Sequence, residues 1–409
     1  MSRGVGANTL SRWRGALVET TMVSGLALTV AAASVTARGA AHAADWLGSS
    51  GDFNLGSNWA GGAVPTDTAS FTNSPTAQRN VVVTSGGTLT LLEYNNNAPA
   101  YTLSTAPSMA LFINNITNNS AFEQTLFAGA TGGFAISGTI TGAMALIGGP
   151  GSGSIQFGTG GSAAGSRFIG QGGLLSLTMG AGDTLSIGSI EGTGVIRALG
   201  GTQTLSVGGL NASTTYAGEI RDSVALTKLG TGALTLSGAN LYTGGTTINA
   251  GSIIAGNDSA FGIGLVMLNG GALATTGVRA IGNNISLTGS SAIRVLDTTA
   301  TFSGAIAAGG NALSLEGAGN GKIVGVISGS GTVTKSGTGT FTLSGANLYT
   351  GGTTINAGSI IAGNDSAFGT GLVMLNGGTL ATTGVRAIGN NISLTGSSAI
   401  RVLDTTATF

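Results

Sequence analysis

The chain has 409 residues, of which 75 are glycine and only 7% are charged, and its formal net charge is zero. Hydrophobic residues make up 42%, too many for a disordered chain, and five prolines are too few for collagen. The absence of cysteine excludes disulfides, thiolate metal sites and cysteine nucleophiles. No basic patch of the kind that binds nucleic acid is present.

The first 43 residues are expected to form a secretory signal peptide. Arg3, Arg12 and Arg14 are followed by the apolar run MVSGLALTVAAASV and by the small-x-small sequence AHA at residues 41–43. Removal of this segment takes away His42, the only histidine, so neither a histidine metal site nor a Ser-His-Asp triad is expected. The mature chain would hold 11 basic and 14 acidic residues (15 − 4 and 15 − 1), a net charge of −3, and no transmembrane helix.

Residues 44–105 differ from the rest of the mature chain because they contain both of its tryptophans, Trp46 and Trp59. We expect this region to form an N-terminal cap together with the first rungs of a solenoid, with the aromatic rings buried in its core. A sugar-stacking surface is the alternative use for these rings. Residues 106–226 follow as short β-branched bursts separated by Gly/Ser turns, a pattern typical of divergent all-β rungs.

A nearly identical passage then occurs twice. Residues 227–302 align without gaps with residues 334–409, and only five of the 76 positions differ. The differences are Leu229/Ser336, Ala233/Thr340, Leu234/Phe341, Ile263/Thr370 and Ala272/Thr379. We therefore define a first block, residues 227–333, and a second block, residues 334–409, which ends inside its copy of the 107-residue unit.

Each block opens with the motif K-x-G-x-G-x-L-x-L-x-G-x-N-x-Y-x-G, which resembles the autotransporter-associated β-strand repeat of passenger domains. In the first block the motif residues are Lys228, Gly230, Gly232, Leu234, Leu236, Gly238, Asn240, Tyr242 and Gly244. In the second block they are Lys335, Gly337, Gly339, Phe341, Leu343, Gly345, Asn347, Tyr349 and Gly351. We interpret them as a structural repeat motif.

The resemblance implies a right-handed parallel β-helix, and the residues are compatible with one. Leu234 and Leu236 would point into the core of a rung, with Thr235 on the opposite face. Glycines 230, 232 and 238 would allow positive φ at the corners, and Asn240 would bond to backbone in its own turn. Rungs of about 20–25 residues make 107 residues about five rungs, and the mature chain about 15.

The function that the resemblance implies is that of a non-enzymatic passenger or stalk at the cell surface, the outer membrane or outside the cell of a Gram-negative bacterium. Adhesion is the expected activity, through host or bacterial surface glycans or through self-association, with no cofactor or metal. The family ends in a C-terminal barrel that this sequence lacks, so the chain is expected to be a fragment. The alternative is a pectin-lyase-like enzyme, for which the only clustered charges are Glu219, Arg221 and Asp222.

Overall fold

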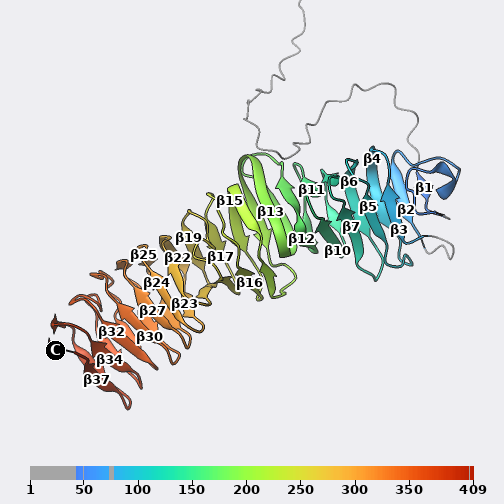
Figure 1. Cartoon of the computed structure of the whole chain (residues 1–409). Helices are drawn as coiled ribbons and strands as arrows, with labels where there is room; N and C mark the ends of the chain where they lie inside the picture. The colour runs from blue at the N-terminus through green and yellow to red at the C-terminus, as the bar shows by residue number, and fades with distance from the viewer. Residues whose placement is uncertain (1–42, 49, 73–77, 405) are drawn as a thin grey trace, which may run out of the picture. The chain divides into compact units, whose positions relative to one another are not determined.

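In the computed structural model, residues 43–48, 50–72, 78–404 and 406–409 are described. The expected signal peptide lies outside them, apart from Ala43. Within these residues the secondary structure consists of 38 strands and one 3-10 helix, η1 (Gly56–Asn58) (Figure 1). A membrane-spanning helix is not found among the described residues. The strands follow from the composition, because Thr, Val and Ile favour extended backbone and the glycines between them favour turns.

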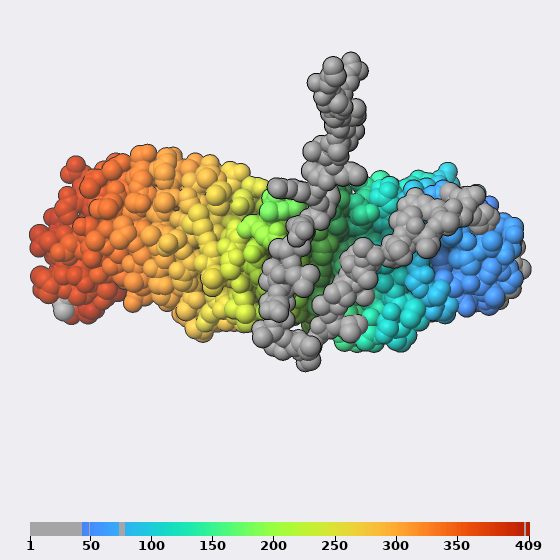
Figure 2. Space-filling model, turned by 90° about the horizontal axis from the view of Figure 1, so that it is seen from above, coloured from blue at the N-terminus to red at the C-terminus, as the bar shows by residue number. Residues whose placement is uncertain are grey.

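The strands form a parallel β-solenoid of about 17 turns, as the sequence predicted. Every named strand pairs in parallel with strands one coil before or after it, and the pairings form three ladders, which we call faces 1, 2 and 3. In Figure 2 the colours of the described residues follow one another in chain order along the stack, as expected when each coil contacts only its neighbours.

The strands of face 1 that pair along the chain are β1 (Ala44–Asp45), β2 (Thr68–Phe71), β4 (Gly87–Tyr94), β6 (Ala110–Asn118) and β9 (Ile140–Thr141). The face continues through the C-terminal part of β15 (Glu219–Lys228) into β17 (Thr246–Ile248), β19 (Val266–Asn269), β22 (Ile285–Gly289), β25 (Ile306–Gly309) and β28 (Ile327–Gly329). The short strands β35 (Arg386–Ala387) and β38 (Ala407–Thr408) pair with each other further on.

Face 2 contains β3 (Asn80–Val83), β5 (Thr102–Thr105), β7 (Gln124–Ala128), β10 (Met144–Gly148) and parts of the long strands β12 (Ala163–Leu177) and β13 (Thr184–Val207). It continues through β14 (Thr214–Tyr216), β16 (Ala233–Leu236), β18 (Ser252–Ala255), β20 (Ala272–Thr275), β23 (Ser291–Val295) and β26 (Leu313–Glu316). Its last strands are β29 (Val333–Lys335), β31 (Thr353–Ile355), β33 (Val373–Leu375) and β36 (Ile392–Leu394).

Face 3 begins with the N-terminal parts of β4 and β6 and continues through β8 (Gly133–Ile136), β11 (Ser154–Phe157), β12, β13 and the N-terminal part of β15. Further along are β21 (Arg279–Ile281), β24 (Thr299–Phe302), β27 (Asn320–Ile323), β30 (Thr340–Leu343), β32 (Ser359–Ala362), β34 (Thr379–Thr382) and β37 (Ala399–Val402). The ladders continue across residues 105 and 226, so the subdivisions drawn there remain a prediction.

Coil length decreases near the start of the first block. Arg167 bonds to Glu191 of the next coil, 24 residues later, and the register of Ile196 with Ile220 gives the same spacing. Asn240 bonds to Ile220 of the previous coil, 20 residues earlier. The next two registers on face 1 keep this shorter spacing. The wide coils before about residue 220 therefore meet narrower coils at the start of the first block.

The 107-residue unit is not a whole number of coils, which corrects the expected five rungs. Lys228 ends the face 1 strand β15, and its counterpart Lys335 ends the face 2 strand β29. Five coils from β15 along face 1 lead to β28, and β29 follows on the next face. The unit is therefore five coils plus one face, and equivalent residues of the two blocks lie on successive faces.

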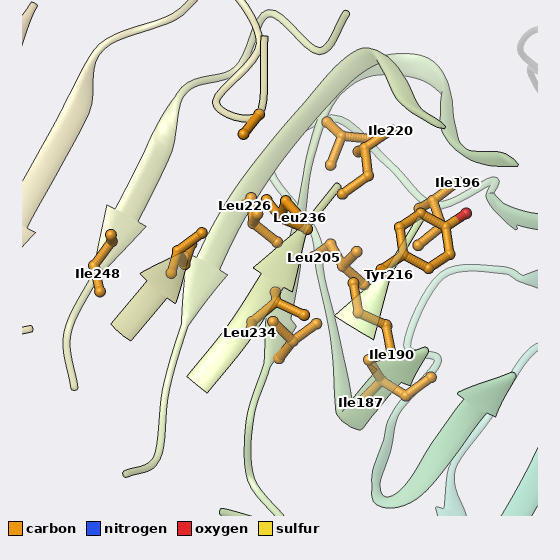
Figure 3. Packing of buried hydrophobic residues seen from close by; sticks show 14 of the residues in the cluster. Ile187, Ile190, Ile196, Leu205, Tyr216, Ile220, Leu226, Leu234, Leu236 and Ile248 are labelled. Atoms are coloured by element: carbon orange, nitrogen blue, oxygen red, sulfur yellow. The ribbon is translucent and has the colours of Figure 1, made fainter. Parts of the chain in front are cut away.

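The core consists of the inward side chains of all three faces. In Figure 3, Leu226, Leu234, Leu236 and Ile220 point toward one another inside the coil. These side chains are at most 2% exposed, and burial of such a side chain contributes about 1.5–3 kcal/mol. The pattern of the sequence explains this arrangement, because alternate residues of a strand point to opposite sides.

The two tryptophans of the mature chain are buried in the first coils, as expected. Trp46 and Trp59 pack edge to face with ring centroids 4.9 Å apart, and they form an isolated antiparallel bridge. The indole N–H of Trp59 donates to the carbonyl of Phe53 at 2.7 Å. Phe71 packs beneath them at 5.6 and 5.8 Å. Their rings are therefore packed inside the stack instead of forming a sugar-stacking surface.

We predict that the one core difference between the blocks is matched to its neighbour in the preceding coil. The ring of Phe341 occupies the space above Gly321, whereas Leu234 pairs with Thr214. Leu234→Phe should therefore lower the free energy of unfolding by about 1–3 kcal/mol through overpacking. Urea unfolding measures this change, and the exposed replacement Leu229→Ser, which copies the second block, should stay within about 0.5 kcal/mol of wild type. An unchanged stability of Leu234→Phe would contradict the matching.

Candidate functional site

The motif of each block covers one strand end, the next strand and the turn after it. In the first block it runs from the end of β15 through β16 into the loop at residues 237–245. In the second block it runs from the end of β29 through β30 into the loop at residues 344–352. Both apolar pairs, Leu234 with Leu236 and Phe341 with Leu343, point inward and are buried, while Thr235 is half-buried on the outer surface.

The lysine of the motif is buried and folds back onto the corner that follows it. The ammonium group of Lys228 donates to the carbonyls of Leu229 at 2.5 Å and Gly230 at 2.9 Å. Lys335 donates to the carbonyls of Ser336 at 2.8 Å and Gly337 at 2.7 Å. Burial lowers the pKa of both lysines, that of Lys335 to about 8, although Glu316 opposes the shift there.

The glycines of the motif serve two different purposes, and the sequence predicted only one of them. Gly230 has φ 67°, the left-handed conformation that glycine adopts without strain. Gly232 and Gly238 do not have positive φ, so the expectation for these two was wrong. A β-carbon on Gly238 would instead clash with the carbonyl oxygen of Gly218 in the preceding coil. Close approach of neighbouring coils therefore explains this glycine.

The asparagine of the motif links three consecutive coils and does not bond within its own turn as expected. Asn240 is 1% exposed. Its carbonyl oxygen accepts from the backbone N–H of Ile220 at 2.8 Å, and its amide donates to the carbonyl of Ala260 at 2.8 Å. Each partner lies 20 residues away. Asn347 makes the same two bonds, to Ile327 at 2.9 Å and to Ala367 at 2.6 Å.

The tyrosine of the motif brings its ring into the core and satisfies its hydroxyl there. The hydroxyl groups of Tyr242 and Thr246 are 2.6 Å apart, and those of Tyr349 and Thr353 are 2.5 Å apart. Burial raises the pKa of both tyrosines. Because its lysine, asparagine and tyrosine bond inside the stack, the motif presents no reactive group at the surface.

The charged cluster considered for catalysis lies in β15 and not in a turn. Asp222 has φ 62° and pairs with Arg197 of the previous coil at 3.1 Å. Glu219 lies 3.9 Å from Arg221. Both carboxylates are thus engaged with arginines, which does not favour the pair of free carboxylates that glycoside cleavage requires.

Sequence reasoning did not identify one concave feature of the outer surface. A groove of about 580 Å³ lies where wide coils meet narrow ones, and we call it the junction groove. Its lining includes Ile169, Glu191, Ser213, Thr215, Thr235 and Ile254. No local pattern marks these residues, because they come together only when the coil lengths are known. The change of spacing from 24 to 20 residues is the one signal that could have located them.

Comparisons with known proteins agree with the motif. A family model described as the passenger-associated-transport-repeat matches residues 226–255 and 333–362. The chain is 33% identical over 200 residues, 45% of its length, to an adhesin BmaC autotransporter of Brucella suis biovar 1 (strain 1330). That stretch spans 6% of the adhesin. No solved structure matches the chain significantly. The two matches support an autotransporter passenger with repeats, exported to the cell surface, the outer membrane or the surroundings of the cell.

We predict that replacing the asparagine of the motif destabilises the stack. Asn240→Ala leaves a buried backbone N–H and a buried carbonyl without partners, at about 1–3 kcal/mol for each group. Chemical unfolding should show the loss, and Asn347→Ala should show a similar one. Asn269→Ala is the control, because Asn269 is exposed and bonds only to the side chain of Asn249. A stability of Asn240→Ala equal to that of the control would show that the bridge is dispensable.

We predict that the buried lysine makes stability depend on pH. Lys335 has a folded pKa of about 8, below its ordinary value of 10.5, so the folded state takes up its proton less readily than the unfolded state. The penalty is fully present below pH 8 and is relieved as the pH rises from about 8 to about 10. The unfolding midpoint of wild type should therefore rise relative to that of Lys335→Met between about pH 7 and about pH 9.5. Parallel pH profiles for the two proteins would rule this out.

Proposed function

We propose that the chain is an adhesive, non-enzymatic part of a passenger, which presents its outer surface to a partner outside the cell. The observation that carries the proposal is the similarity over 200 residues to an autotransporter adhesin. The direction of the motif side chains supports it, because they bond inside the stack and leave the exposed faces to variable residues. The motif builds the scaffold, and the outer columns make contact.

The outer surface is suited to extended contacts that do not depend on charge. Outward columns of the blocks carry hydroxyl and small side chains, such as Thr227, Thr247 and Ser286 on face 1. Charges are few along the whole chain. Surface glycans and a second copy of the chain are the partners that such a surface fits, since both are bound through many weak contacts. The enzyme alternative is not favoured, because its clustered carboxylates are held by arginines.

The test is adhesion by the exported chain itself. Beads that carry the mature chain should bind to epithelial cells or to bacteria of the producing strain in a saturable way, and free chain should compete. Beads coated with an unrelated secreted protein are the control. Binding no stronger than that of the control beads would refute the adhesive function. Release of unsaturated fragments from a pectin-like polymer with Ca²⁺ would instead establish the enzyme.

A further inference from the structure

The junction groove has a physical origin in the change of coil length. Coils of 24 residues carry more backbone around the core than coils of 20 residues. The outer surface therefore steps inward where the two kinds meet on face 2. At about 580 Å³, the groove falls within the range of ligand sites, about 300–1,000 Å³.

The floor of the groove is a single outward column that crosses five coils. Ile169 pairs with Glu191, and Gly192 beside it pairs with Tyr216, which places Glu191 next to Thr215. Thr215 pairs with Thr235, and Thr235 with Ile254. The column thus has apolar side chains at both ends and polar ones between them, spaced by about 4.8 Å per coil.

The polar groups in the middle of the groove are available to a ligand. Within the described part of the chain, the hydroxyls of Thr215 and Thr235 form no hydrogen bond. Ser213 accepts from the backbone N–H of Ala233 at 3.0 Å, which leaves its own hydroxyl proton free. These three hydroxyls can donate as well as accept.

The electrostatic character of the groove disfavours anionic ligands. Arg167 beside it is held by two carboxylates, Glu123 at 2.8 Å and Glu191 at 2.9 Å. This set carries one positive and two negative charges, and no other lysine or arginine lines the groove. A sulfate, phosphate or sialic acid carboxylate would therefore meet a net negative charge.

The backbone around the groove excludes an extended peptide as a β-strand partner. Strands β14, β16 and β18 are paired with coils on both sides, so no strand edge is open there. Strand addition needs such an edge. Recognition must instead proceed through side-chain hydroxyls and apolar contacts, which is how a polyhydroxylated ring with one apolar face is held.

We propose that the junction groove binds neutral saccharide units of a glycan chain. Sugar hydroxyls bond to Thr215, Thr235 and the carboxylate of Glu191, and the apolar faces of the rings pack on Ile169 and Ile254. This assignment rests on the proposed adhesive function and gives it a site. The second block does not repeat the site, because the equivalents of Thr235 and Ile254, Thr342 and Ile361, lie on face 3 among coils of nearly uniform length.

The duplication supplies a matched control for the test. Thr235→Arg fills the groove with a long side chain, and Thr342→Arg places the same change at the same motif position on another face. Both variants and wild type are applied to an array of neutral oligosaccharides, with sialylated and sulfated oligosaccharides alongside. Wild type and Thr342→Arg should bind the same neutral glycans, and Thr235→Arg should bind them at least about tenfold more weakly. Circular dichroism and the unfolding midpoint confirm that the variants are folded.

Three results would overturn the groove assignment. They are equal glycan binding by Thr235→Arg and wild type, equal loss in both variants, and binding confined to the anionic glycans. Bead adhesion separates this assignment from the broader function. Wild-type beads that adhere equally well after Thr235→Arg retain the adhesive function without the groove, whereas wild-type beads that do not adhere remove the adhesive function itself. Adhesion to cells that protease abolishes and glycosidase does not would identify a protein partner instead.

Discussion

The rest of the structure depends on the hydrogen-bond register between consecutive coils. A coil can bond to the next only if each strand returns to its own face after one turn, so the number of residues per turn is the quantity that the sequence must hold constant. The bridges of Asn240 and Asn347 act on this quantity directly, because each joins a backbone N–H and a carbonyl that lie 20 residues before and after it. A coil of different length would leave both buried groups without partners.

The same constraint explains why the motif is polar and yet buried. Lys228 and Tyr242 have few neighbours along the sequence to satisfy them, but the corner carbonyls and Thr246 lie within reach once the coil closes. Their polar groups therefore favour one particular coil path over the alternatives that a glycine-rich chain would allow. The cost is a lysine that resists its proton, and the benefit is an outer surface left free of structural duties.

The sequence predicted the fold well, because strand alternation and the glycine corners of the motif are local patterns. The inward position of Leu234 and Leu236 and the burial of Trp46 and Trp59 were read from them. What the sequence could not predict depends on partners in neighbouring coils. The coil bridge of Asn240, the close packing at Gly238 and the junction groove all follow from coil length, which appears only when the ladders are traced. The sequence also repeats after one long unit while the structure repeats after a coil, and these two periods do not coincide.

That mismatch gives the duplicated blocks different directions, so a contact surface copied by duplication faces a new side of the stack. The absence of cysteine allows the direction to be measured by pulsed electron paramagnetic resonance between nitroxides on introduced cysteines. Thr235 and Ser336 lie in one column five coils apart, at about 24 Å, whereas Thr235 and its equivalent Thr342 lie on different faces. We predict a clearly longer distance for the pair at 235 and 342 than for the pair at 235 and 336. Equal distances would place the two blocks on one face and contradict the offset of one third of a turn.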